Sequence, residues 1–250
     1  MKLRFCLKVV ALTSVLSSFS AQAFVTSGFK WDSTTLGEGA SLTWGFADDG
    51  SDCRVGSDAC GGGTVSDVSG NIIPGEEPGT IFREISQAFD SWSDVADLAF
   101  SFTTDANPDI LIGGHSVDGA NNVLGHTFTS FFVNSGLDQA DISDIHFDTD
   151  DTFGLDANTS GGFFPNFLAH EIGHALGLDH VSDVNALMNP IIQRSFIGPQ
   201  ADDIAGIREL YGESGTTPPD TTPIPLPAAF WMMLSGLGFF TTMRKRVVAQ

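Results

Sequence analysis

Three histidines in the segment His170–His180 constrain the fold more than any other feature of the chain. Positions i and i+4 of a helix share a face, so His170 and His174 can direct their imidazole nitrogens at one point. Gly177 permits the left-handed conformation that ends a helix, after which the chain can reverse and bring His180 back. The segment therefore predicts a helix over about 166–177 that ends beside a three-histidine cluster.

The chemistry of this cluster points to a catalytic metal. Three imidazoles that leave a fourth position open are typical of a catalytic zinc, whereas structural zinc sites are closed by four protein ligands. Zinc lowers the pKa of a bound water to about 7, and Glu171, beside the first ligand, can take the proton. A histidine pair with a glutamate also arises by chance, but Gly177 and His180 at their offsets argue against that. We predict zinc at His170, His174 and His180, with Glu171 as general base.

The remainder of the chain predicts short strands mixed with helices. Apolar residues recur at helical spacing from Thr80 to Leu98, and another helix is expected over Ala201–Leu210. Strands are expected near 42–46, 100–103, 110–112 and 145–147, and loops over 46–79 and from 113 to about 143. Because strands and helices do not alternate regularly, the pattern favours the α+β class.

These motifs resemble the metzincin zinc metallopeptidases, and their matrixin branch in particular. Residues 186–190, centred on Met188, resemble the Met-turn that lies under the metal. Residues 88–95 and 202–212 resemble the first and the closing matrixin helix, and Gly125–Phe128 and His146–Asp148 resemble two strands. The resemblance covers about 30–212. It implies a twisted mixed β-sheet with three helices, an active-site cleft and zinc-dependent endopeptidase activity.

The resemblance also implies a second, structural zinc. Matrixins hold it with three histidines and one aspartate, and His115, His126 and His146 match the three histidines. The loop after His115 is shorter than in the family, and the matching aspartate is missing. Asp118 or a water would then complete the site, or the site is weak. The alternative is that these are ordinary packing histidines.

Calcium sites follow from the same resemblance. Asp118, Asp148 and Asp151 match one family site, and Asp109 and Asp144 match a second. Carboxylate oxygens are ligands that Ca²⁺ prefers. The alternative is an acidic, solubilising surface, because the chain has 31 acidic and only 11 basic residues. That imbalance argues against nucleic-acid binding, which needs lysine and arginine at phosphates.

The substrate contacts and the mode of activation are likewise expectations from the resemblance. Leu124 and Gly125 would form a strand edge that holds an extended protein or peptide substrate, and Pro190 and Ile192 would wall the pocket. No cysteine switch precedes the domain. We expect instead that a new N-terminal ammonium at Phe24 pairs with an aspartate of the closing helix, Asp202 or Asp203.

The N-terminal residues 1–23 predict a secretory signal peptide. Lys2, Arg4 and Lys8 precede an apolar run, and Ala21–Ala23 is a small-x-small cleavage site. The alternative is an uncleaved anchor, for which the run is short. Cleavage would remove Cys6 and leave Cys53 and Cys60, which in an exported protein are most simply one disulfide across a surface loop.

The C-terminal residues predict a segment that spans or is sorted at a membrane. A Pro/Thr-rich linker over 213–223 leads to 20 mostly apolar residues, Ile224–Met243, and a basic cluster at 244–246, within the segment 224–250. This tail resembles the PEP-CTERM (VPLPA-type) sorting signals of Gram-negative bacteria, which implies an exosortase-type partner. The protein would be extracellular, at the cell surface, or membrane-anchored facing the periplasm. One alternative is a surface or biofilm-matrix binding protein, although such a protein has no need of Glu171. Another is a different zinc hydrolase, such as an amidase, which the matrixin-specific matches do not support.

Overall fold

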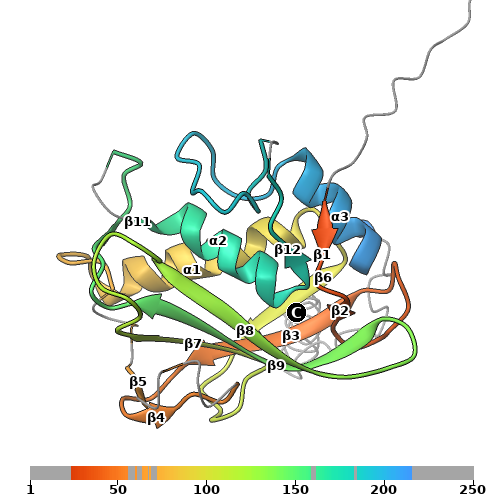
Figure 1. Ribbon diagram of the computed structural model, residues 1–250, viewed down its shortest axis with the longest axis horizontal. Helices are drawn as coiled ribbons and strands as arrows, with labels where there is room; N and C mark the ends of the chain where they lie inside the picture. Colours follow the sequence, from red (N-terminus) through yellow and green to blue (C-terminus); the bar gives the residue numbers. More distant parts are fainter. Residues whose placement is uncertain are drawn as a thin grey trace, which may run out of the picture. The chain divides into compact units, whose positions relative to one another are not determined.

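The described part of the chain comprises residues 24–55, 60, 64–66, 68, 72–158, 162–182 and 185–215 of a computed structural model (Figure 1). The chain divides into two units, 1–216 and 217–250, and every described residue lies in the first. The predicted signal peptide, most of the predicted linker and the apolar C-terminal segment lie outside the described residues. Within the described residues, no helix has both the length and the apolar character needed to cross a bilayer.

A six-stranded sheet forms the centre of the fold. Its strands are β2 (Phe29–Lys30), β3 (Ala40–Phe46), β6 (Leu98–Phe102), β7 (Ile110–His115), β8 (Gly125–Phe132) and β9 (Asp138–Asp148). The order β2–β9–β7–β3–β6 is parallel throughout, and β8 pairs antiparallel with β9. Because β9 is the only described strand that pairs with β8, the other edge of β8 is open to a further strand.

Strands β8 and β9 correct the loop expected from 113 to about 143. None of the residues of β8 is fully buried, so its apolar residues do not alternate as they would in a half-buried strand. Asp138, Asp141 and Asp144 interrupt the apolar pattern of β9. Strand β7 also extends past the expected 112, through Gly113 and Gly114 to His115.

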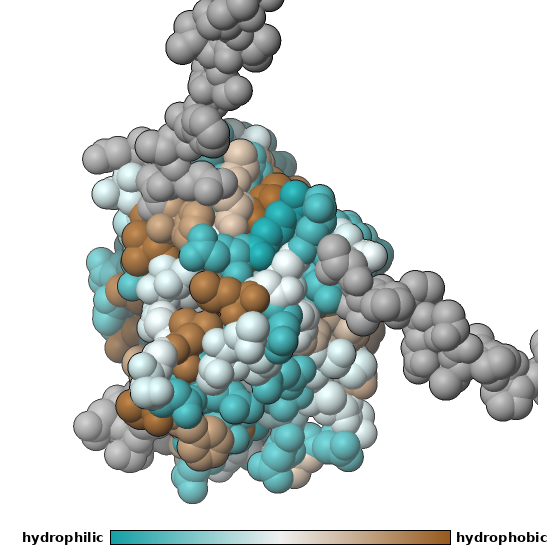
Figure 2. Space-filling view, turned by 90° about the vertical axis from the view of Figure 1, so that its right-hand side faces the viewer, coloured by the Kyte–Doolittle hydropathy of each residue, from teal (hydrophilic) through white to brown (hydrophobic). Residues whose placement is uncertain are grey.

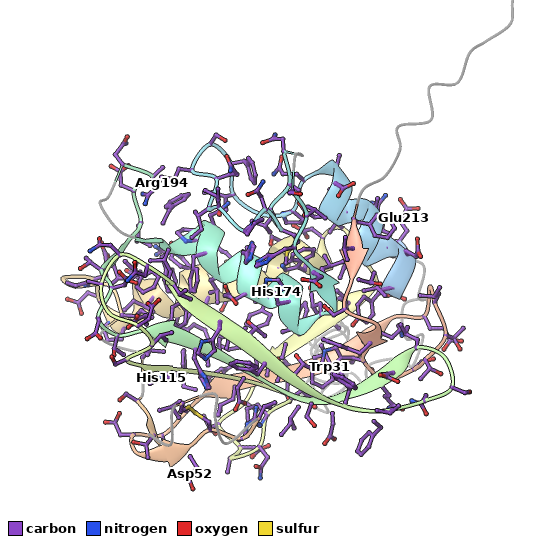
Figure 3. All side chains as sticks on the ribbon, viewed as in Figure 1. Trp31, Asp52, His115, His174, Arg194 and Glu213 are labelled. Atoms are coloured by element: carbon purple, nitrogen blue, oxygen red, sulfur yellow. A yellow bond between two sulfur atoms is a disulfide. The ribbon has the colours of Figure 1, made fainter. Side chains whose placement is uncertain are left out.

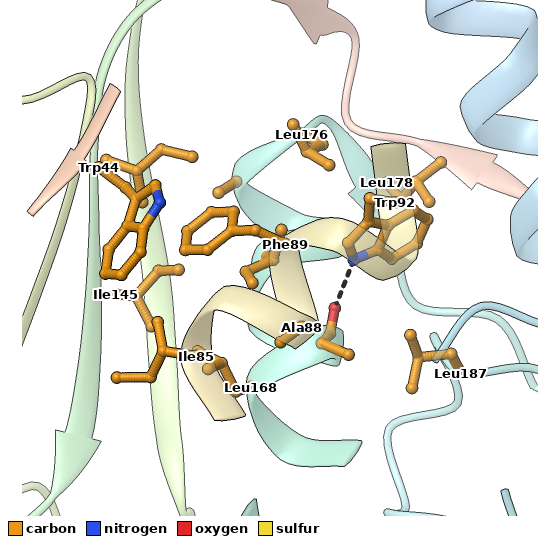
Figure 4. Close-up of a cluster of buried hydrophobic side chains, with 14 of the residues drawn as sticks. Trp44, Ile85, Ala88, Phe89, Trp92, Ile145, Leu168, Leu176, Leu178 and Leu187 are labelled. Atoms are coloured by element: carbon orange, nitrogen blue, oxygen red, sulfur yellow. Dashed lines mark hydrogen bonds between the residues drawn. The ribbon is translucent and has the colours of Figure 1, made fainter. Parts of the chain in front are cut away.

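The described part of the chain has three helices, α1 (Pro78–Ser93), α2 (Phe164–Ala175) and α3 (Ala201–Tyr211). Helices α1 and α2 lie against the sheet, and α3 lies beside strand β12, Leu178–Asp179 (Figure 1). Helix α1 ends at Ser93 rather than at the expected Leu98, because the chain turns there and Leu98 begins β6. Its buried stripe packs on α2, and the Trp92 indole donates to the Ala169 carbonyl at 3.0 Å (Figure 4). Every residue of α2 except His174 is buried.

Short strand pairs hold the connecting segments. Strands β4 (Ser51–Asp52) and β5 (Thr64–Val65) form a small ladder inside the segment expected as a loop. Strands β10 (Phe153–Gly154) and β11 (Gly162–Phe163) precede α2, and β1 (Val25–Thr26) pairs with β12 (Leu178–Asp179) directly after α2. The N-terminal and histidine-bearing segments are therefore joined at the end of α2.

The hydrophobic core lies between the sheet and the α1–α2 layer (Figure 4). Apolar residues on the described part of the surface in Figure 2 occur in small groups between polar ones. Three helices on a mixed, mostly parallel sheet confirm the α+β class expected from the sequence.

Candidate active site and metal centres

The three histidines of the first cluster converge as the spacing predicts. The Nε2 atoms of His170, His174 and His180 form a triangle with all three sides at 3.1 Å. Tetrahedral zinc with Zn–N bonds of about 2.0–2.1 Å would hold its nitrogens roughly 3.3 Å apart. The ligand type and the spacing therefore both fit zinc.

Backbone carbonyls orient two of these rings. The Nδ1 atom of His170 lies 2.7 Å from the Leu187 oxygen, and that of His174 lies 2.9 Å from the Leu178 oxygen. A carbonyl only accepts hydrogen bonds, so Nδ1 carries the proton and Nε2 keeps its lone pair for a metal. Burial also lowers the pKa of His170 to about 3 and that of His174 to about 4, which keeps both rings neutral.

Two glycines permit the close packing around the cluster. Gly177 has φ +97°, and a side chain there would also collide with the Phe29 carbonyl. A Cβ at Gly173 would collide with the sulfur of Met188, which lies buried under the helix. Gly173 thus lets the Met-turn approach α2 closely. The sequence did not predict this role.

The end of α2 is held by residues from both ends of the domain. The Trp31 indole donates to the Ala175 carbonyl at 2.7 Å, and the Tyr211 hydroxyl donates to the Leu176 carbonyl at 2.9 Å. The backbone N–H of Trp31 in turn donates to the Tyr211 oxygen at 3.2 Å. These bonds satisfy carbonyls that a helix end leaves without partners.

Glu171 is buried next to the cluster. Its carboxylate accepts a hydrogen bond of 2.8 Å from the Thr127 hydroxyl on β8. Burial raises the pKa of Glu171 to about 7, against the opposing effect of the Thr127 hydrogen bond. Thr127 was missed as a functional residue, although it lies in the strand that resembles the matrixins.

A cleft of about 910 Å³ opens over Glu171 and the three histidines. Leu124, Gly125, Pro190 and Ile192, which we expected at the substrate, all line it. The volume of this cleft and its mixture of apolar and polar lining residues are typical of a ligand-binding site. Figure 3 shows Arg194 and His174, which line the same cleft, on separate elements above the sheet.

Asp203 supports the Met-turn from below. Its carboxylate accepts backbone hydrogen bonds from Leu187 (2.7 Å), Met188 (3.0 Å) and Gln200 (2.7 Å). Burial raises the pKa of Asp203 despite these bonds. Because the Asp203 carboxylate already binds the backbone of the Met-turn, Asp202 is the better candidate to pair with an N-terminal ammonium.

The second histidine group also assembles. The Nε2 atom of His126 lies 3.3 Å from His115 Nε2 and 3.2 Å from His146 Nδ1. The group can hold a metal, with three nitrogens facing one point. Burial, with the neighbouring imidazoles, lowers the pKa of His126 to about 4 and that of His146 to about 3.

Asp118 belongs to a different group from these histidines. Its backbone N–H donates to Asp148 and its carboxylate accepts from Val123. Asp151 accepts from the backbone of Asn121, and its second oxygen is buried without a hydrogen-bond partner among the described residues. A buried carboxylate oxygen of this kind fits a cation, so the first expected calcium site has a suitable arrangement.

The carboxylates expected at a second calcium site have protein partners. Asp144 is buried and receives the Arg54 guanidinium at 2.8 Å, together with two backbone N–H groups. Asp109 accepts from the backbone and hydroxyl of Thr43. Protein donors thus engage both carboxylates, and calcium at Asp109 and Asp144 stays a prediction from the sequence.

Comparison with known proteins points to the same family as the sequence motifs do. The family model for matrixins (Peptidase_M10) matches residues 74–212. The chain is 34% identical over 168 residues to macrophage metalloelastase of Oryctolagus cuniculus, covering 63% of this chain and 33% of the relative. It is 37% identical over 156 residues to interstitial collagenase A of Mus musculus, covering 58% and 31%.

A third relative, matrix metalloproteinase-19 of Homo sapiens, is 32% identical over 176 residues, covering 60% of this chain and 32% of the relative. The chain thus spans about a third of the length of the curated relatives it matches. The family match extends over more than half of the chain and includes the whole histidine motif and the Met-turn. The chain belongs to the matrixin family.

Proposed function

We propose that this protein is an exported zinc-dependent endopeptidase. The observation that carries the proposal is the 3.1 Å triangle of His170, His174 and His180 nitrogens with the Glu171 carboxylate beside it, at the floor of a cleft. Zinc bound by these three residues would supply Lewis acidity, which activates water and polarises a peptide carbonyl.

The residues of the chain do the proton transfer. Glu171 takes a proton from the attacking water and returns it to the leaving amine. Thr127 holds the Glu171 carboxylate in one orientation, and Leu187 and Leu178 hold two of the imidazoles. The surrounding apolar core keeps these groups fixed, which is the preorganisation that such catalysis needs.

The substrate would be an extended protein or peptide chain. The open edge of β8 offers backbone hydrogen bonds along the cleft, beginning at Leu124 and Gly125. A side chain at Gly125 would collide with the His146 carbonyl and Phe167, so the strand is close-packed on its inner face. Pro190 and Ile192 give the opposite wall an apolar lining.

We also propose that His115, His126 and His146 hold a second zinc, and that Asp118, Asp148 and Asp151 bind calcium. Donor type and grouping support both. We assign Asp118 to calcium because its hydrogen bonds join it to Asp148 and Val123 in the acidic group, and a water would then be the fourth zinc ligand.

Export, sorting and activation remain proposals drawn from the two ends of the sequence. Signal cleavage after Ala23 would create an N-terminus at Phe24. The side chain of Phe24 lies against Gly206 on α3, where a Cβ would meet it at 3.0 Å. Gly206 lies one helical turn after Asp202 on α3, and this supports Asp202 as the partner of the new terminus. The tail 224–250 would anchor or sort the chain through an exosortase-type enzyme.

The decisive experiment compares the parent with Glu171→Ala. We expect both to bind zinc, and the variant to lose at least about a hundredfold in peptide cleavage, since general base catalysis contributes that much. Zinc content and cleavage of an unbiased peptide library, with and without chelator, measure this. Glu209→Ala, an exposed glutamate on α3, is the matched control. If parent and Glu171→Ala bind zinc equally and neither cleaves peptides, the binding-protein alternative replaces the enzyme.

A further inference from the structure

His146 belongs to two different groups of potential metal ligands. Its Nδ1 atom faces His126 at 3.2 Å within the three-histidine group. The residue lies in β9, is 1% exposed, and is therefore held with a fixed ring orientation. Its Nε2 atom, on the opposite side of the ring, is buried and has no hydrogen-bond partner among the described residues.

Two sulfur atoms lie close to the His146 ring. Cys53 and Cys60 are joined in a disulfide, and their Sγ atoms lie together with a ring nitrogen of His146 within 4.8 Å of one another. Figure 3 shows the sulfur pair near His115, on the side of the sheet away from the helices. The second nitrogen of a metal-bound histidine almost always donates to an oxygen, so a sulfur pair in this place is unusual.

The chain holds the cysteines firmly against the sheet. The β4–β5 ladder flanks them, and Ser66 exchanges two backbone hydrogen bonds with Gly114 of β7. Next to Cys53, the Arg54 guanidinium binds Asp144 and the Pro108 and Ser143 carbonyls. Cys60 is buried with Ala47, Val65 and Leu111. None of these hydrogen bonds is made by the disulfide, so opening the S–S bond removes none of them.

We propose that Cys53, Cys60 and His146 form a redox-gated site for a thiophilic divalent cation such as zinc. In the oxidised protein the disulfide sulfurs are poor ligands and His146 serves the three-histidine group. In the reduced protein two thiolates and the Nε2 nitrogen provide an S₂N ligand set of the kind that zinc prefers. A neutral imidazole has one nitrogen with a free lone pair and one that carries a proton. His146 can therefore bind a metal in one group only, unless it also loses that proton. Filling the sulfur site thus weakens metal binding at the three-histidine site.

The chemistry balances with an external dithiol as reductant. The dithiol gives up two electrons and becomes a disulfide, and the Cys53–Cys60 bond is replaced by two thiols. Each thiol loses its proton to solvent when its sulfur binds the cation, because the thiolate is the metal ligand. An external disulfide reverses the sequence as oxidant: it accepts the two electrons and becomes two thiols, the Cys53–Cys60 bond forms again, and the cation is released.

Cadmium is the probe, since thiolate–cadmium bonds absorb in the ultraviolet and oxygen or nitrogen ligands do not. The full chain carrying Cys6→Ser is reduced with a phosphine, desalted anaerobically and titrated with Cd²⁺. We expect a charge-transfer band that saturates with one cation per chain and is absent before reduction. The variant with Cys53→Ser and Cys60→Ser is the control and should show no band.

A second measurement tests the histidine. Cadmium-113 NMR of the reduced parent should give the shift of a site with two sulfurs and one nitrogen. His146→Gln should weaken cadmium binding by more than about tenfold, since loss of even an outer-shell partner can cost that much. The proposal is overturned if the reduced parent shows no band beyond the double-serine variant, or if the cadmium shift indicates sulfur without nitrogen. These readouts do not depend on peptidase activity.

Discussion

Within the described residues, the Thr127 hydroxyl donates the only side-chain hydrogen bond that the Glu171 carboxylate accepts. It connects the edge strand that would hold substrate with the group that would move the proton. Hydrogen bonds to charged groups contribute about 1.5–3 kcal/mol. At the scale of a single residue, Thr127 is therefore the side chain whose removal should affect the chemistry without touching a metal ligand.

Thr127→Val should lower kcat by roughly ten- to a hundredfold, the rate equivalent of such a bond. Zinc content should stay unchanged, because the Thr127 hydroxyl bonds to Glu171 and not to any of the three histidines of the first cluster. Thr127→Ser keeps the hydroxyl and should retain most of the activity. Steady-state kinetics on one peptide checks all three proteins, and equal rates for the valine and serine variants would remove Thr127 from the mechanism.

Residue types and spacing were enough to anticipate His170, His174, His180 and Glu171. A helix face and one glycine turn determine where these four residues lie, and both are local properties. The supporting partners were not predictable in this way. Leu187, Asp203 and Thr127 reach the site through tertiary packing, and a carbonyl or hydroxyl partner far along the chain leaves no periodic signal.

The helices and strands differ in how well the sequence indicates them. The apolar stripe of α1 is regular, so its existence was predictable, while its C-terminal end was placed five residues too late. Strands β8 and β9 were expected largely as loop, because an edge strand exposes both faces in part and β9 carries four aspartates. One of these, Asp144, is buried against the Arg54 guanidinium, a pairing that spans 90 residues.

Strand β1 and helix α3 meet where we propose that activation occurs. Retaining one extra residue before Phe24, or replacing Asp202 by Asn, should each lower activity several-fold, as a partly exposed ion pair contributes at most about 1 kcal/mol. The combination should cost no more than either change alone, because both remove the same pair. Peptidase assays of the four proteins form the cycle. Full activity in the extended protein would exclude the ion pair.

At the scale of the whole molecule, buried histidines make stability depend on pH. Four of them have pKa values lowered to about 3 or 4 by burial: His126, His146, His170 and His174. The unfolded chain binds protons at these groups below about pH 6.5, while the folded chain does not. The metal-free protein should therefore lose stability as the pH falls from about 6.5 towards 4.

Two buried carboxyl groups act in the opposite direction. Glu171, with a pKa of about 7, and Asp203 bind protons more readily in the folded state, which adds stability on acidification. Because four histidines lower the free energy of unfolding in acid and only two carboxyl groups raise it, acidification should destabilise the protein. Urea unfolding of chelator-treated protein at pH 7.5 and 5 measures it, and a higher midpoint at pH 5 would contradict the balance. Zinc should steepen the loss, because its ligands must be deprotonated.

The bond from Tyr211 to the end of α2 has an optical consequence. Tyr211 is the only tyrosine of the chain, and burial raises the pKa of its phenol above the usual value. Ionised phenol absorbs near the edge of the protein spectrum, so an alkaline titration of this protein reports from one known point in its interior. The tyrosinate signal should appear together with the loss of the fold, as a single step, and not along the ordinary titration curve of an exposed phenol.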